Sequence, residues 1–360
     1  MNKRKLNAMH DALYAKIRAF LAKKTRVRIF KKKSHKNALT REQIREVKRF
    51  FAPYAIPNMA FHRFFTEKTG DFYPNYIPID LYVGYIDPYF NDLHAVKFID
   101  NKCYYDSWFH DFPQPYLVLK RVNNIWLDHY GKPADSERMK AIIEEEKEGL
   151  FLKKAEDSLG GLGVTFIESN TEAFYNIVNL SKQIKCDIVI QRRIIQHAEF
   201  AKFNSASVNT IRIYSILRKD GSVKIYSSVF RIGVGNARVD NYVSGGVSCG
   251  INADGTLKKY AYNKNGERTD IHPHSKIVFE GSKLPFYEKA VELVKKAHLT
   301  IPHFRSVSWD IAIGEDGNPI LIEANLSRGS IDLLQLSNGP MFGEDTKEIL
   351  DEVFAKSKKC

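Results

Sequence analysis

Apolar residues recur along this chain with two periods, one typical of helices and one typical of strands. Helices are expected at about residues 4–24, 40–52, 135–148, 171–183, 285–298 and 344–357. Short apolar runs joined by turn residues predict hairpins at residues 115–128, 150–168, 210–233, 251–260 and 309–325. A buried strand is expected at residues 187–190, and the pattern from Ser207 onward is antiparallel.

Two N-terminal segments carry further structural signals. Thr40 and Gln43 stand three residues apart, as in a capping box, and predict the start of the second helix. Residues 54–116 are dense in aromatic residues and prolines. Such a segment could stack bases or sugars, but so many prolines favour the core of a small, loop-rich subdomain.

Composition narrows the protein class. The chain has 360 residues, of which 44% are hydrophobic, so it can bury a sizeable core and form two or three subdomains. Its four cysteines are scattered and show neither metal-ligand nor disulfide spacing. A reducing, cytoplasmic compartment is therefore expected. The sequence shows no transmembrane run and no signal peptide.

The net charge of +13 is concentrated at the N-terminus. Residues 1–36 hold thirteen Lys and Arg against Asp11, which leaves 42 basic and 41 acidic residues, or +1, for residues 37–360. The body therefore gives no indication of nucleic-acid binding. The basic amphipathic helix at 4–24 favours an anionic membrane surface or an acidic partner. Alternatively, it packs on the protein or ends as a frayed tail. Binding to anionic liposomes that is lost on deletion of residues 1–36 would distinguish these cases.

The hairpin at residues 309–325 carries candidate metal ligands. Asp310 begins its first strand, and Glu323 and Asn325 end its second strand on one shared face. Folding at the Gly-rich turn brings Asp310 beside that pair. Converging carboxylate and amide oxygens suit Mg²⁺, which completes its octahedron with water and nucleotide phosphates. The alternative is a surface hairpin with solvated acids.

A glycine-rich loop lies between the two strands of the hairpin at 150–168. Glycines allow backbone amides to approach phosphate oxygens, and Lys153 just before the loop can supply charge. The loop candidates are Ser158, Gly160, Gly161 and Gly163. The loop is neither a Walker motif nor a Rossmann fingerprint, because no Gly-Lys-Ser/Thr follows and it leads into a strand. It is either a phosphate flap or a turn without a ligand.

Several further polar residues interrupt apolar strands or loops. Lys120 is either a solvated strand lysine or a phosphate contact, and the strand exit formed by Gln191, Arg192 and Ile194 could face an adenine edge or be ordinary interior. Arginines inside a sheet usually pair with carboxylates or phosphates, and here they are Arg212 and Arg231. A second phosphate-proximal loop is suggested by Asn241, Gly245 and Gly246.

Taken in this order, the residues resemble the ATP-grasp superfamily over roughly residues 115–340. Each motif is weak alone, but the ordered set that ends in Asp310…Glu323-x-Asn325 is specific. Within the superfamily, the chain looks like the sugar-transfer-associated proteins of bacterial surface and capsular polysaccharide loci. That likeness rests on VNTIRI, VDNYVSGGV, HPHS with FEGSKLP, and SWDIAI…PILIEAN. The aromatic N-terminal part, with DNKCYYDSWFHDFPQP, also resembles that group, and its polar residues Asp100, Asn101, Lys102 and Tyr105 have no clear role. Two departures are Lys153-Lys154 in place of Lys-Pro, and Gln191 in place of the usual hinge acid.

The resemblance implies an α+β fold in which two subdomains clasp ATP between antiparallel sheets, with an N-terminal helical and aromatic extension. The expected division is a basic arm at 1–36, an aromatic subdomain at 37–114, a nucleotide subdomain at 115–200 and a catalytic subdomain at 201–360.

The resemblance also implies roles for the candidate residues. Asp310, Glu323 and Asn325 would hold two Mg²⁺, and Lys153, with Lys120, would contact the phosphates of ATP. Arg212 and Arg231 would stabilise the transferring group. Asn241, Gly245 and Gly246 would lie near the γ-phosphate.

The implied activity is that of an ATP-dependent ligase that joins a carboxylate to an amine through an acyl phosphate and releases ADP and phosphate. The expected substrates are a small carboxylate and an amine or sugar, and the expected location is the cytoplasm or the inner membrane face. Two alternatives stay open. One is a kinase that transfers phosphate to a hydroxyl, and the other is a glycan-binding protein with a degenerate nucleotide site.

Overall fold

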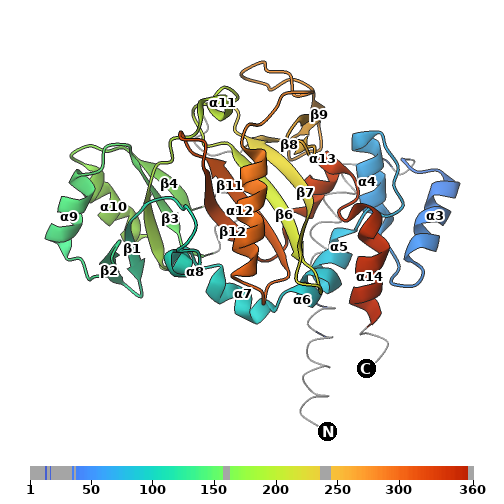
Figure 1. Cartoon of the computed structure of the whole chain (residues 1–360), viewed down its shortest axis with the longest axis horizontal. Coiled ribbons are helices and arrows are strands. Elements are labelled where there is room, and N and C mark those ends of the chain that lie inside the picture. Colours follow the sequence, from blue (N-terminus) through green and yellow to red (C-terminus); the bar gives the residue numbers. More distant parts are fainter. Residues whose placement is uncertain are drawn as a thin grey trace, which may run out of the picture.

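Two antiparallel sheets organise the protein (Figure 1). The structure, a computed structural model, describes residues 38–156, 163–235 and 245–355, together with Leu13, Ile17 and His35. The smaller sheet has the strand order β2-β1-β5-β3-β4 and the larger sheet the order β10-β9-β8-β7-β6-β11-β12. The expected α+β fold with two antiparallel sheets is therefore confirmed. The predicted helix at 4–24 and most of the basic arm lie outside the described residues.

The five-stranded sheet forms one lobe of the molecule. Its strands are β1 Leu117–Val122, β2 Ile125–Asp128, β3 Leu150–Lys154, β4 Val164–Ile167 and β5 Ile188–Arg192. Helices α9 (Ser136–Glu144) and α10 (Ala173–Lys182) pack on one face of it through a shared core that includes Met139, Ile177 and Ile190. The predicted hairpin at 115–128 is confirmed, and its turn residues Asn123 and Asn124 have positive φ angles (50° and 64°), as a tight hairpin turn requires.

The seven-stranded sheet forms the centre of the molecule. Its strands are β6 Thr210–Leu217, β7 Val223–Ile232, β8 Val247–Ile251, β9 Leu257–Tyr262, β10 Arg268–Thr269, β11 Ser306–Ile313 and β12 Pro319–Asn325. Helix α12 (Tyr287–Leu299) lies across one face and covers Ile213, Phe230 and Trp309 (Figure 1). Because side chains alternate along a strand, the residues between these apolar ones face the opposite side.

That opposite side is partly covered by N-terminal and C-terminal helices. They are α3 Arg41–Phe51, α4 Met59–Thr69, α5 Ile79–Leu81, the π-helix η2 Tyr82–Ile86, α6 Asp87–Phe90, α13 Ile331–Asn338, the 3-10 helix η6 Gly343–Asp345 and α14 Thr346–Ala355. Aromatic residues of α4 and the following loop, such as Phe65 and Tyr76, share one core with Tyr214 of β6 and with α13 and α14. The aromatic segment is thus core, as favoured, and that core continues into the larger sheet. The domain boundaries stay a prediction.

A linking segment passes between the sheets. It comprises α7 (Leu93–Ile99), the 3-10 helix η3 (Lys102–Tyr104) and α8 (Tyr105–Trp108), and a further short helix, α11 (Ala198–Ala201), follows β5.

The predicted capping box is present, since Thr40 accepts from the backbone of Gln43 and the Gln43 side chain accepts from Thr40. The pattern did not predict α4 or α13.

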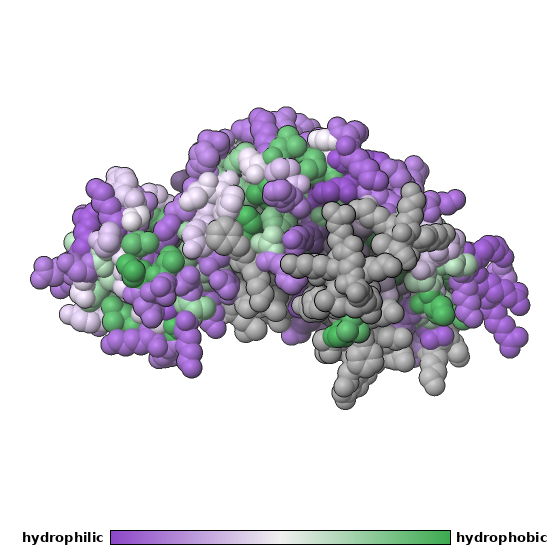
Figure 2. Space-filling view, turned by 90° about the horizontal axis from the view of Figure 1, so that it is seen from below, coloured by the Kyte–Doolittle hydropathy of each residue, from purple (hydrophilic) through white to green (hydrophobic). Residues whose placement is uncertain are grey.

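Seen from below (Figure 2), the described surface of the five-stranded lobe is largely hydrophilic with small hydrophobic areas. In the described part of the chain, no helix is long and apolar enough to cross a membrane.

Two buried histidines pack in the helical layers. His298 of α12 donates from Nε2 to the Phe304 carbonyl, and its Nδ1 accepts from Ser215, whose hydroxyl accepts from Trp309 Nε1. His62 of α4 bonds the Pro74 carbonyl. Burial lowers the pKa of each imidazole to about 4, although the carbonyl contact opposes this. Both rings are therefore neutral in the folded protein at neutral pH.

These histidines predict a loss of stability in mild acid. The unfolded chain binds protons with the ordinary histidine pKa, whereas the folded protein does not until about pH 4, so stability is full above about 6.5 and falls below it. Each histidine should cost about 2 kcal/mol of unfolding free energy between pH 7 and 5. Denaturant unfolding at both pH values measures this. His298→Gln should reduce the loss of stability between the two pH values by about 2 kcal/mol, and an unchanged dependence in that variant would contradict the assignment.

Candidate active site

Strand pairing brings the three candidate metal ligands onto one face of the larger sheet. Asp310 of β11 lies directly opposite Glu323 of β12, and Asn325 lies opposite Ser308. A bulge at Ile322 follows, because Ile311 pairs with Leu321. The predicted convergence of Asp310, Glu323 and Asn325 at one end of the hairpin is therefore confirmed, while their role stays a prediction.

Asp310 is held by two arginines from neighbouring strands. Arg212 of β6 donates from Nε to Oδ1 and from Nη2 to Oδ2, both at 2.7 Å, and Arg231 of β7 donates from Nη1 to Oδ2 at 2.9 Å. All three side chains are buried, with exposures of 5% for Asp310, 9% for Arg212 and 7% for Arg231. Burial raises the pKa of the Asp310 carboxyl, but the two guanidinium groups outweigh burial and hold it well below its ordinary value. Asp310 is therefore ionised.

Glu323 pairs with a lysine that the sequence did not single out for this site. Lys102 of η3 donates from Nζ to Glu323 Oε1 at 2.7 Å, and its side chain is only 8% exposed. Burial lowers the pKa of Lys102, but Glu323 outweighs burial and raises it above the ordinary value. Asn325 is anchored through its amide nitrogen, which donates to the Ser308 carbonyl at 3.0 Å.

Lys153 approaches the same cluster from the smaller sheet. Its Nζ donates to the side-chain oxygen of Gln191 on the adjacent strand β5 at 2.9 Å. Burial, followed by repulsion from Lys102, lowers the pKa of Lys153 to about 8, while Glu323 acts in the opposite direction. Charged groups of both sheets therefore meet in one place, and Lys153 has a neutral amide as its described partner.

Among the described residues, the cluster contains four cationic side chains and three carboxylates. Lys102, Lys153, Arg212 and Arg231 face Asp310 and Glu323, with a further carboxylate, Asp100, near Lys102. A partly buried surplus of positive charge is unfavourable unless an anion neutralises it. This arrangement suits a polyanionic ligand between the sheets.

A model of the sugar-transfer associated ATP-grasp family matches residues 83–350. This chain belongs to that family. The resemblance inferred from the sequence is thus confirmed, and it extends further toward the N-terminus than the motifs alone suggested. The matched range includes Lys102 and the linking segment as well as both sheets. No curated protein sequence matches this chain.

Solved structures share the fold at low sequence identity. An L-amino acid ligase from Bacillus licheniformis is 13% identical over 71% of this chain and 47% of that one, with a TM-score of 0.41. The biotin carboxylase domain of the 2-oxoglutarate carboxylase from Hydrogenobacter thermophilus is 16% identical over 73% and 46%, with a TM-score of 0.44. The ATP-grasp ligase PsnB with Mg and ADP is 14% identical over 74% and 62%, with a TM-score of 0.42. This ATP-grasp chain spans less than half of the first solved structures that it matches.

The donor set of this ATP-grasp protein fits Mg²⁺ with a nucleotide. In the described ranges, no three His, Cys, Asp or Glu side chains are grouped to hold a metal. Glu323 and Asn325 offer a carboxylate and an amide oxygen, and Mg²⁺ usually combines a few such protein ligands with water and phosphate oxygens. Two buried hydroxyls on the same face, Ser248 and Ser308, have no hydrogen-bond partner among the described residues. They too are available to a ligand or to water.

The remaining sequence candidates also have defined contacts. Lys120 is not a solvated lysine, because its Nζ donates to the Cys103 carbonyl at 2.9 Å and to Asp106 at 2.6 Å, and its contact with phosphate stays a prediction. Arg192 forms two hydrogen bonds to Glu146 (2.7 and 2.8 Å), and Ile194 follows it half-buried. The segment after β5 then bonds the larger sheet, because the backbone N–H of Glu315, in the turn between β11 and β12, donates to the Ile195 carbonyl. The exit thus connects the two lobes, and its contact with an adenine edge stays a prediction.

The glycine candidates are described only in part. Gly163 has a φ of +89° where β4 begins, and its carbonyl accepts from Lys154, so the predicted pairing of β3 and β4 as a hairpin is confirmed. Gly245 has a φ of +100° and is exposed, and Gly246 is buried just before β8. The loop candidates outside the described residues are Ser158, Gly160, Gly161 and Asn241. Their roles stay predictions.

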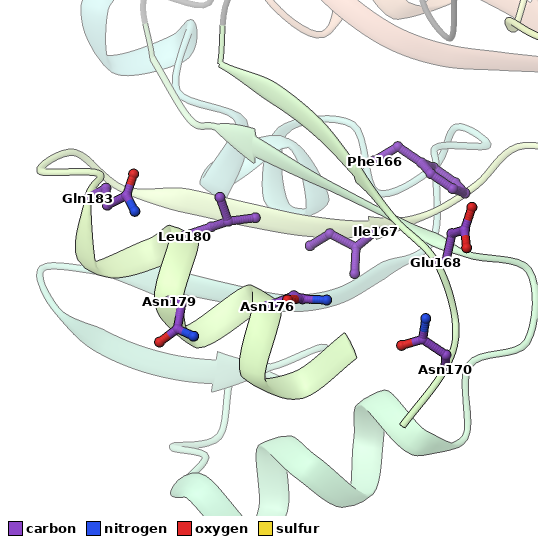
Figure 3. A pocket seen from close by; sticks show the side chains of 8 residues that line it. All are labelled: Phe166, Ile167, Glu168, Asn170, Asn176, Asn179, Leu180 and Gln183. Carbon is purple, nitrogen blue, oxygen red and sulfur yellow. The ribbon is translucent and has the colours of Figure 1, made fainter. Parts of the chain in front are cut away.

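A depression of about 370 Å³ lies on the outer side of the smaller lobe, between β4 and α10 (Figure 3). Its polar lining comes from exposed amides such as Asn170, Asn179 and Gln183. These residues are distinct from those of the charged cluster. The cluster, with its buried ion pairs, is therefore the better candidate for the active site.

The double pairing of Asp310 predicts a large effect of its removal on stability. Asp310→Ala leaves Arg212 and Arg231 buried without their carboxylate, so unfolding free energy should fall by roughly 3–5 kcal/mol. Denaturant unfolding measures the change. Glu315→Ala, an exposed acid in the turn of the same hairpin, is the matched control and should stay within about 0.5 kcal/mol of the unmodified protein. Equal stabilities for the two variants would contradict the role of Asp310.

Proposed function

We propose that this protein is an ATP-dependent carboxylate–amine ligase. In this reaction a substrate carboxylate oxygen attacks the γ-phosphorus of ATP, the bond to the β-phosphate oxygen breaks, and ADP leaves. An amine nitrogen then attacks the acyl carbon, the bond to the phosphate oxygen breaks, and the amine loses a proton as phosphate is released. The family assignment supports ATP as the phosphoryl donor.

One observation carries the proposal. Four cationic side chains from two sheets and the linking segment surround two acidic side chains and an amide on one sheet face. Phosphoryl transfer depends mainly on positioning and on neutralising charge, so it needs such a cluster more than a protein nucleophile. A surplus of cations on a buried face is what a triphosphate requires.

The residues divide between metal and phosphate. Glu323 and Asn325 would hold Mg²⁺, and Asp310 would join them through Oδ1, since its described hydrogen bonds use three of the roughly four acceptor positions of a carboxylate. When bound, Mg²⁺ neutralises phosphate charge and orients the γ-phosphate, and two ions are expected. Lys153 would contact the phosphates, and Arg212 and Arg231 would stabilise the transferring group.

The family description supports the proposed pathway. Sugar-transfer association supports a role in making or modifying bacterial surface polysaccharide, with an amino acid joined to a sugar as one form of the reaction. The basic arm at residues 1–36 would bring the protein to the inner membrane face, where an anionic surface attracts Lys and Arg. The role at the membrane and the identity of both substrates are part of the proposal.

Calorimetry and turnover test the proposal together. We expect saturable binding of Mg-ATP that Glu323→Ala weakens by at least about tenfold, as loss of a metal ligand does. Glu315→Ala should bind like the unmodified protein. Absence of binding, or equal binding by Glu323→Ala, would contradict the assignment.

Release of ADP distinguishes the ligase from a kinase. A screen of amino acids and amino sugars should show phosphate release only when a carboxylate and an amine are both present. ADP formation with a sugar hydroxyl alone, without free phosphate, would instead support a kinase.

A further inference from the structure

Lys102 is a component of the site to which the sequence motifs and the proposed roles give no function. It comes from η3, in the segment that links the N-terminal helices to the smaller sheet. Its ammonium lies 2.7 Å from Glu323 Oε1 on β12. The same ammonium is close enough to Lys153 to lower the pKa of that lysine and close enough to Asp310 to interact with its charge. Lys102 thus lies at the centre of the cluster.

The backbone around Lys102 is fixed to both sheets. On the side of the smaller sheet, Lys102 N donates to the Ala155 carbonyl at 3.0 Å, and Asn101 donates to Glu156 at 2.9 Å. On the side of the larger sheet, the Tyr105 hydroxyl donates to the Ala324 carbonyl at 3.2 Å and accepts from Ala324 N at 3.1 Å. The strand between Glu323 and Asn325 is therefore tied to this segment without any help from the Lys102 side chain.

A lysine is not needed merely to join these parts. Taking an ammonium and a carboxylate out of water costs free energy, and apolar residues of similar size often stabilise a protein as well or better. Cys103, which is 1% exposed, already packs against Ala155 and Val189 of the smaller lobe, and Tyr105, which is 4% exposed, belongs to the core of the larger sheet. The charge of Lys102 thus points to a function at Glu323.

We propose that Lys102 is an exchangeable counter-ion of Glu323. In the protein without nucleotide it neutralises the carboxylate, and when a divalent cation takes Glu323 the ammonium turns to an anionic phosphate oxygen. The inference rests on the proposed function. The four-carbon stem of lysine allows the ammonium to change partner while the backbone stays in place. Lys102 thereby couples metal binding to phosphate binding, and each makes the other more favourable.

Two equilibria with opposite expected changes test the inference. Lys102→Met keeps most of the stem and removes the charge. Mn²⁺ alone should bind this variant about tenfold more tightly than the unmodified protein, because no ammonium competes for Glu323. The paramagnetic resonance of the free ion measures this binding. ADP in the presence of EDTA, followed by calorimetry, should bind about tenfold more weakly because one cation is lost. Lys182→Met, an exposed lysine at the end of α10, is the matched control and should change neither.

The outcomes separate this inference from the proposed function. Opposite changes in the two affinities support it, and Lys102→Gln should reproduce them if Lys102→Met proves unstable on heating. Unchanged affinities, or weakening of both, would overturn the counter-ion role while leaving the ligase assignment intact. Failure of the unmodified protein to bind Mn²⁺, ADP and Mg-ATP would overturn both.

Discussion

The buried pairing of Asp310 with Arg212 and Arg231 is the constraint on which the active-site face depends. The three side chains lie on adjacent strands, with Asp310 directly opposite Arg212 in the ladder. A buried carboxylate requires such partners, and buried arginines require a carboxylate or another anion. The same alternation that sends Trp309 and Ile311 into the core under α12 sends Asp310 to the other face. Register, burial and charge therefore place these groups together.

The second determinant is the segment around η3, which lies between the two sheets. Its backbone bonds Ala155, its tyrosine bonds Ala324, and its lysine pairs with Glu323. Lys120, which the sequence suggested for phosphate, also bonds this segment through Asp106. The aromatic N-terminal region is thus more than a cover for the larger sheet. It supplies a charged group to the site and fixes the relation of the lobes around it.

Local patterns predicted the parts of the site that belong to single hairpins. Asp310, Glu323 and Asn325 are close in sequence, and a turn of Gly, Asp and Asn brings them together, so the sequence shows their convergence directly. Arg212 and Arg231 stood out because charge is rare within strands. Lys102 stood out in the sequence only as a polar residue without a clear role, since its contact is with a residue 221 positions away. It lies in a loop-rich stretch without periodicity. Likewise, nothing local showed that Lys120 pairs with Asp106, or that the aromatic residues share a core with Tyr214.

A crystal structure with ADP and Mn²⁺ would test most directly the claim that this cluster is a metal–nucleotide site. The anomalous signal of Mn²⁺ locates the metal independently of the protein model. We expect a peak within about 2.3 Å of oxygen atoms of Glu323 and Asn325, phosphates beside Lys153, and the Lys102 ammonium turned away from Glu323. A metal and nucleotide bound elsewhere, such as in the depression between β4 and α10, with Lys102 still on Glu323, would contradict the account.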